Sequence, residues 1–115
     1  MLKLKAGQLN FPGLSKGNFE KGYSDIVIEV VLYDKWEKGG YVAGANRIVT
    51  NAYGDISEAK ITLYVSGITT VKNTYLTLGH EIRHMSPDNR EMKDKIAKEA
   101  DAEQYGKWLA AQFGY

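Results

Sequence analysis

Hydrophobic and polar residues alternate through the first half of the chain in the way that β-strands require. The run Asp25 to Tyr33 (DIVIEVVLY) is dense in β-branched residues and predicts a core strand largely buried on both faces. The run Ala59 to Gly67 (AKITLYVSG) alternates apolar with polar side chains and predicts a half-exposed strand at a sheet edge. Between them, Tyr41 to Tyr53 indicates extended chain interrupted near Gly44, and a short strand is expected near Leu2 to Leu4.

From Thr69 onward, apolar residues recur every three or four positions instead of every two. They form one helical stripe that consists of Val71, Tyr75, Leu78, Ile82 and Met85. Thr69 or Thr70 is available as the N-cap of this helix. The turn-forming residues 86–89 interrupt the pattern, and a second helix is expected from about Arg90 to Phe113. The pattern predicts an α+β fold with one domain over residues 1–115.

Composition and charge exclude several classes of function. With 15 basic and 14 acidic side chains the formal charge is +1, which gives no electrostatic footprint for nucleic acid or an anionic membrane. No segment reaches the roughly 20 apolar residues of a membrane-spanning helix, and the start lacks a signal-peptide pattern, so a cytoplasmic location is expected. Because the chain has no cysteine, a bound metal would need His and carboxylate ligands.

Both histidines of the chain lie in the stretch LGHEIRHM, residues 78–85. On a helix, His80 and His84 are one turn apart, so their rings can converge on one ion. This is the HExxH arrangement, in which two imidazoles bind Zn²⁺ and Glu81 acts on the metal-bound water as general base and acid. The alternative is that both histidines are surface residues of an amphipathic helix.

A catalytic zinc ion normally has three protein ligands, and the third must here be a carboxylate. On the second helix, Glu99 and Glu103 are expected in the middle of a broad apolar face, whereas Asp94 and Asp101 point to solvent. We predict Glu99 as the ligand and Glu103 as its neighbour that accepts a hydrogen bond from a ligating imidazole; the reverse assignment stays open. Alternatively, both glutamates lie at the edge of the face and pair with Lys95 and Lys107.

These residues resemble a gluzincin, a metallopeptidase in which HExxH is completed by a Glu on a following helix. His80, Glu81, His84 and the segment KEADAEQYGKWL carry the resemblance. The order of elements is similar to that of the minigluzincins, and the Glu-Ala-Asp run is similar to that of ImmA/IrrE-type peptidases. The resemblance implies a zincin-like fold: a small twisted, mostly antiparallel sheet, then the HExxH helix and a C-terminal glutamate helix.

The resemblance also implies how such an enzyme treats its substrate. A peptide or protein substrate would lie in extended form along an edge strand, here Ala59 to Ser66. Thermolysin-like enzymes use an extra Tyr or His to stabilise the oxyanion, and Tyr105 or Tyr75 is the candidate here. Minigluzincins resemble zymogens, so a terminal segment, either the N-terminal stretch or the tail AAQFGY, is a candidate to block the cleft.

The sequence therefore predicts a zinc-dependent metallopeptidase that is latent if a terminal segment blocks its cleft. The alternative is a catalytically inactive zinc-binding regulatory or interaction domain. A purely structural site has no need of Glu81 beside the first ligand, and this favours chemistry.

Overall fold

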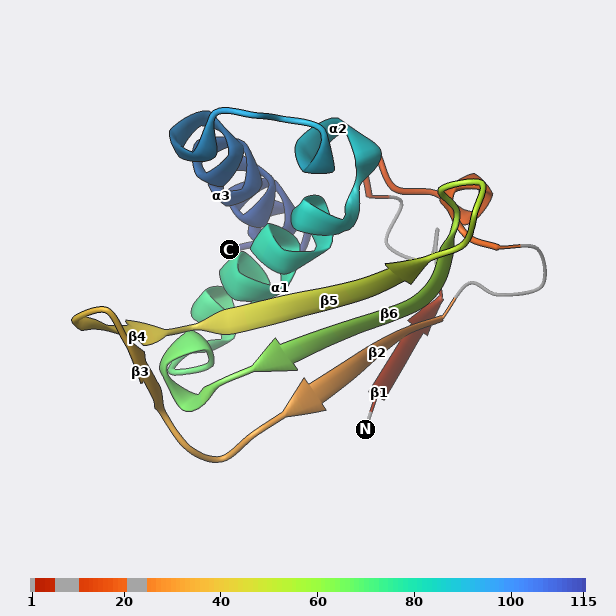
Figure 1. Cartoon of the computed structure of the whole chain (residues 1–115). Coiled ribbons are helices and arrows are strands. Elements are labelled where there is room, and N and C mark those ends of the chain that lie inside the picture. Colours follow the sequence, from red (N-terminus) through yellow and green to blue (C-terminus); the bar gives the residue numbers. More distant parts are fainter. Residues whose placement is uncertain (1, 6–10, 21–24) are drawn as a thin grey trace.

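The computed structural model describes residues 2–5, 11–20 and 25–115, and its centre is a four-stranded mixed sheet (Figure 1). The strands lie in the order β1-β2-β6-β5, with bounds Leu2–Lys5, Asp25–Val30, Ile56–Leu63 and Gly44–Thr50. Strand β2 is antiparallel to β1 and parallel to β6, and β5 is antiparallel to β6. Strands β3 (Lys35–Glu37) and β4 (Gly40–Val42) form a separate antiparallel hairpin. The predicted α+β class is confirmed.

Three α-helices follow the sheet and lie on one of its faces (Figure 1). They are α1 (Val71–Met85), α2 (Pro87–Arg90) and α3 (Lys95–Gln112), and two 3₁₀ turns cover Lys16–Asn18 and Val65–Gly67. Thr70 is the N-cap of α1, and its hydroxyl accepts a hydrogen bond from the backbone N–H of Asn73. In the described part of the chain, no helix combines the length and the apolar character that crossing a membrane requires.

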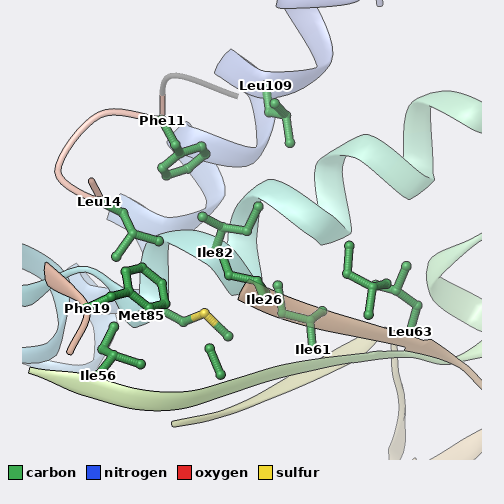
Figure 2. Packing of buried hydrophobic residues seen from close by; sticks show 12 residues of the cluster. Phe11, Leu14, Phe19, Ile26, Ile56, Ile61, Leu63, Ile82, Met85 and Leu109 are labelled. Atoms are coloured by element: carbon green, nitrogen blue, oxygen red, sulfur yellow. The ribbon is translucent and has the colours of Figure 1, made fainter. Parts of the chain in front are cut away.

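The hydrophobic core lies between the sheet and the helices (Figure 2). Strand β6 contributes Ile61 and Leu63, and α1 contributes Ile82 and Met85, all of them almost fully buried. Three side chains of the N-terminal segment close one end of this core, namely Phe11, Leu14 and Phe19. Burial of these apolar side chains fixes α1 against the sheet, so the residues on its other faces have defined positions.

Two glycines allow α1 and α3 to approach closely where they cross. A Cβ atom on Gly79 would lie 2.8 Å from the Cα atom of Gly106, and one on Gly106 would clash with the carbonyl oxygen of Leu76. Any side chain at either position would force the two helices apart. This close crossing brings the first turn of α3 next to the last turns of α1, where both histidines lie.

The strand predicted at residues 25–33 is shorter and less buried than expected. Strand β2 ends at Val30, and only Ile26 and Ile28 are buried, whereas Leu32 and Tyr33 beyond it are exposed. The prediction of burial on both faces was wrong because helices cover only one face of the sheet. On the other face, Lys60 and Glu29 form an ion pair at 3.2 Å.

The predicted edge strand lies in the interior of the sheet. Strand β6 has β2 on one side and β5 on the other, and the last three residues of the predicted strand, Val65 to Gly67, form a 3₁₀ turn. Its alternating pattern reports that one face of the sheet is exposed to solvent, and this does not depend on whether the strand has a free edge. The strand with the free edge beside α1 is β5.

The second predicted helix, from about Arg90 to Phe113, begins later than expected, and the predicted break at residues 86–89 overlaps a short helix, α2. Ser86 ends α1 and also caps the short α2, and α3 begins only after its N-cap Asp94. The buried face of α3 consists of Ala102, Gly106, Leu109 and Ala110. Glu99 and Glu103 are therefore exposed at the margin of this face, not in its middle as predicted.

Candidate metal centre

His80, His84 and Glu99 converge at the crossing of α1 and α3. The Oε2 atom of Glu99 lies 3.0 Å from the Nε2 atom of His80 and 3.2 Å from the Nε2 atom of His84. The two Nε2 atoms are 3.1 Å apart. Three atoms that can each ligate a metal thus form a nearly equilateral triangle, and the structure brings together the three residues predicted as ligands.

This triangle fits a zinc ion. Three N and O ligands about 2.1 Å from a tetrahedral ion lie about 3.4 Å from one another, close to the observed separations. The side chain of Glu99 is 52% exposed and those of the two histidines are 29% and 11% exposed, so one side of the triangle faces solvent. Among the described residues the cluster contains three donors, which leaves a further coordination position for water or substrate.

Asn89 selects the tautomer of the neutral His84 ring. Its Oδ1 atom lies 2.7 Å from the Nδ1 atom of His84. Its Nδ2 atom donates to the backbone oxygen of Lys98 and to the Oδ2 atom of Asp101, both at 2.9 Å, so the amide cannot be flipped without losing both bonds. The Nδ1 atom of His84 must then carry the proton. The Nε2 atom is left with its lone pair toward the candidate metal position, as ligation requires.

Asp101 is held in place by Arg83, whose side chain is only 8% exposed. The Nε atom of Arg83 donates to the Oδ2 atom of Asp101 at 2.7 Å, and the guanidinium also stacks on the ring of Tyr105 at 3.9 Å. The prediction that Asp101 points to solvent was wrong, because α1 supplies a buried cation opposite it. A continuous set of hydrogen bonds therefore runs from Arg83 through Asp101 and Asn89 to His84.

The hydrogen bond from Arg83 holds the pKa of the Asp101 carboxyl below its usual value, although partial burial acts in the opposite direction. A lowered folded-state pKa gives stability that is complete above the unfolded value of about 3.9 and is lost as the pH falls through the folded value. Asp101→Asn should therefore lower the free energy of unfolding by about 3 kcal/mol at pH 7 and weaken its decline in acid. Urea denaturation in EDTA, at about pH 7 and pH 3, checks both expectations.

Asp88→Asn is the matched control, since Asp88 also faces Arg83, at 3.9 Å, but is 71% exposed. We expect it to cost less than about 1 kcal/mol. Equal losses for Asp88→Asn and Asp101→Asn, or parallel acid profiles for wild type and Asp101→Asn, would show that the buried pair has no special role.

Glu81 lies beside the triangle and is 6% exposed. Its Oε1 atom accepts a hydrogen bond of 2.8 Å from the Nδ2 atom of Asn46 on β5. Strand β5 comes this close to α1 because position 44 is glycine: a Cβ atom there would lie 2.8 Å from Thr77 and 3.2 Å from the Cγ atom of Glu81. Asn46 of β5 thus orients one carboxylate oxygen of Glu81, and the Glu81 side chain lines the pocket beside the triangle.

Two pockets meet at Glu99 and follow β5. The first, which we call the Gly44 pocket, measures about 450 Å³ and is lined by residues that include Gly44, Leu76, Thr77, His80, Glu81 and Glu103. The second, the Ile48 pocket, measures about 510 Å³ and is lined by Asn46, Ile48, His84 and a group of basic side chains. The triangle therefore lies within a cleft that extends in both directions along the strand.

The other predicted site residues have different places. Glu103 lines the Gly44 pocket, but the recorded hydrogen bonds of the two imidazoles go to Glu99, Asn89 and each other. Neither Tyr105 nor Tyr75 lines either pocket; the first packs on Phe11 and the second stacks on Phe113. We therefore assign no oxyanion role to these two tyrosines.

The alternative ion pairs of Glu99 and Glu103 with lysines on the same helix do not form among the residues that the structure describes. Within residues 11–20 and 25–115, Lys95 forms no ion pair with Glu99, and Lys107 forms none with Glu103. The ionisable partners of Glu99 in this part of the chain are the two histidines.

Two residues of the site, Asn46 and Asn89, were not singled out by the sequence analysis. Asn46 lies in a stretch of weak strand pattern, and Asn89 follows Ser-Pro-Asp and was interpreted only as a turn residue. The available signal for Asn89 was its distance of five residues from His84, which allows a side chain after the helix end to return to the ring.

Comparison with known proteins gives no relative. No protein family, curated protein or solved structure matches the chain at a significant level. The function must therefore be inferred from the site alone.

Proposed function

We propose that this protein is a zinc-dependent metallopeptidase of the gluzincin type, with His80, His84 and Glu99 as ligands and Glu81 as general base and acid. The observation that carries the proposal is the convergence of these three donor atoms within 3.0–3.2 Å of one another, next to a buried glutamate. The HExxH motif alone predicts two ligands. The third candidate ligand, Glu99, lies 15 residues after His84 in the sequence.

The residues around the triangle have the properties that peptide hydrolysis requires. A zinc ion bound there would lower the pKa of a coordinated water to about 7. Glu81, with one oxygen held by Asn46, takes the proton of the attacking water and delivers it to the leaving amine. Asn89 keeps the ring of His84 in the ligating orientation throughout.

Strand β5 offers a place for an extended peptide. The backbone N–H of Tyr64 donates to the oxygen of Ala43 at 3.0 Å, so residues 43 and 64 form a hydrogen-bonded pair. In an antiparallel ladder such pairs alternate, and the backbone groups of Gly44, Asn46 and Ile48 therefore point away from β6 toward the free edge. A substrate added to this edge would pass the triangle with side chains entering both pockets.

Latency stays a prediction. Phe113 and Tyr115 of the tail stack on Tyr75, and neither they nor the described N-terminal residues 11–20 line the Gly44 pocket or the Ile48 pocket. Residues 1, 6–10 and 21–24, on which the prediction of an N-terminal block falls in part, lie outside the described residues.

The direct test measures zinc content and peptide cleavage on the same preparation. We expect about one zinc per chain after reconstitution, and cleavage of unfolded casein that 1,10-phenanthroline abolishes and added zinc restores. A zinc-loaded protein that cleaves no peptide, either as the full chain or with its first ten residues removed, would instead support the inactive zinc-binding domain. A chain that binds no zinc would exclude both.

A further inference from the structure

The Ile48 pocket carries an unusual concentration of positive charge. Four basic side chains line it, namely Arg90, Lys93, Lys95 and Lys98, against one carboxylate, that of Glu99. In the part of the chain that the structure describes, none of the four forms an ion pair. The Nε atom of Arg90 is in addition buried without a hydrogen-bond partner among the described atoms. A buried donor of this kind is costly unless an acceptor reaches it.

The acidic residues of the same segment do not neutralise this charge. Glu91 and Asp55 line a neighbouring pocket that Arg90 also borders, but among the described residues neither carboxylate forms an ion pair with Arg90. Asp94 uses its carboxylate to cap α3, where its Oδ1 atom accepts a hydrogen bond of 3.0 Å from the backbone N–H of Ile96. The chain has a formal charge of only +1, so the basic pocket is a local feature and does not follow from overall charge.

The Gly44 pocket has the opposite character. Its charged lining residues are Glu81, Glu99 and Glu103 against Lys107. The two halves of the cleft therefore differ in the sign of their charge, and the boundary between them is the candidate metal triangle.

We propose that the Ile48 pocket selects an acidic side chain, Asp or Glu, on one side of the scissile bond of a peptide substrate. This inference rests on the proposed peptidase function and names its substrate class. A peptide added to the edge of β5 advances about 3.4 Å per residue and alternates its side chains, so a side chain one to three residues from the scissile bond reaches the pocket. Its carboxylate then meets the four cations, and the guanidinium of Arg90 can bind it through two N–H groups.

The expected size of the preference follows from the number of cations. A single exposed ion pair contributes little to binding, but several cations act on one carboxylate here, so we expect about tenfold selectivity over the neutral amide. The preference should weaken to about twofold in roughly 0.5 M NaCl, because salt screens exposed charges.

The test uses peptidyl hydroxamates as probes of the zinc-loaded full chain. A hydroxamate binds the metal whether or not the bond-cleaving step operates. One series of short alanine peptides carries the hydroxamate at the carboxyl end, and the other series carries it at the amino end. In each series, Glu or Gln replaces the alanine at the first, second or third position from the hydroxamate. We expect Glu to bind about tenfold more tightly than Gln in one series only, because the other half of the cleft is acidic.

Lys93→Glu/Lys95→Glu reverses two of the four cations and should abolish or invert the preference. The matched control is Lys16→Glu/Lys72→Glu, which changes the net charge by the same amount at exposed positions that line neither pocket. It should keep the preference for Glu within about twofold, the effect of a distant screened charge.

The outcomes separate the two proposals. If the Gln probes bind and the Glu probes bind no better in either series, the acidic selectivity is wrong and the peptidase proposal stands. Equal loss of the preference in both double variants would also overturn it, since overall charge would then be the cause. If no hydroxamate binds the zinc-loaded chain, the metal has no accessible position and both proposals fail.

Discussion

Glu81→Gln is expected to lower kcat/KM for peptide cleavage by about 10³-fold while the zinc content stays unchanged. Glutamine keeps the shape of the side chain and an oxygen that can accept the hydrogen bond from Asn46, so the contact between α1 and β5 survives. What it loses is the ability to take a proton from water. The measurement is the rate of cleavage of a quenched-fluorescence peptide beside elemental analysis of the same samples.

Glu58→Gln is the control for this variant, because Glu58 is an exposed residue of β6 that lines neither half of the cleft. It should retain activity within about twofold, as surface changes of this kind usually have small effects. If Glu81→Gln retained full activity, Glu81 would not be the base. If Glu81→Gln lost its zinc, the residue would have a structural role in the metal centre.

The HExxH helix was predictable because its determinants are local. The apolar stripe, the Thr70 cap and the i, i+4 spacing of the histidines all lie within 16 consecutive residues, and a helix converts such spacing directly into geometry. The same locality explains why the two histidine rings meet, since no distant element is needed to bring them together.

The position of the strands was not predictable in the same way. The alternating polarity of β6 indicates that one face of the sheet is exposed to solvent. Interior and edge strands of a two-layer fold both have this pattern. Which strand has the free edge depends on pairing between segments far apart in sequence, such as Val27 with Lys60. The sequence analysis therefore expected a free edge at β6, whereas the strand with the free edge is its neighbour β5.

Glu99 was predicted as the ligand from a premise that the structure corrects. The prediction assumed a carboxylate on a buried face, whereas Glu99 is half exposed at the margin of that face. What places it near the histidines is the close crossing of α1 and α3 at Gly79 and Gly106, which depends on tertiary packing. Asn46 and Asn89 were missed for the same reason, because each meets its partner only after separate elements have packed.

The ligand set itself gives the last prediction. His80→Ala, His84→Ala and Glu99→Ala should each weaken zinc binding by more than about 100-fold, because loss of a supporting partner alone typically costs 10- to 100-fold. Glu103→Ala should bind zinc like the wild type, since Glu103 lies one turn further along the same helix and has no recorded hydrogen bond to either imidazole. Zinc affinity can be measured by competition with a chromophoric chelator.

Glu103→Ala is also the control that makes this series decisive. It removes the same side chain as Glu99→Ala from the same face of α3, so helix propensity and net charge change equally in the two variants. If Glu103→Ala lost zinc and Glu99→Ala kept it, the roles of the two glutamates would be reversed. If both kept it while the histidine variants lost it, α3 would supply no essential ligand, and the gluzincin proposal would fail because its defining third ligand is absent.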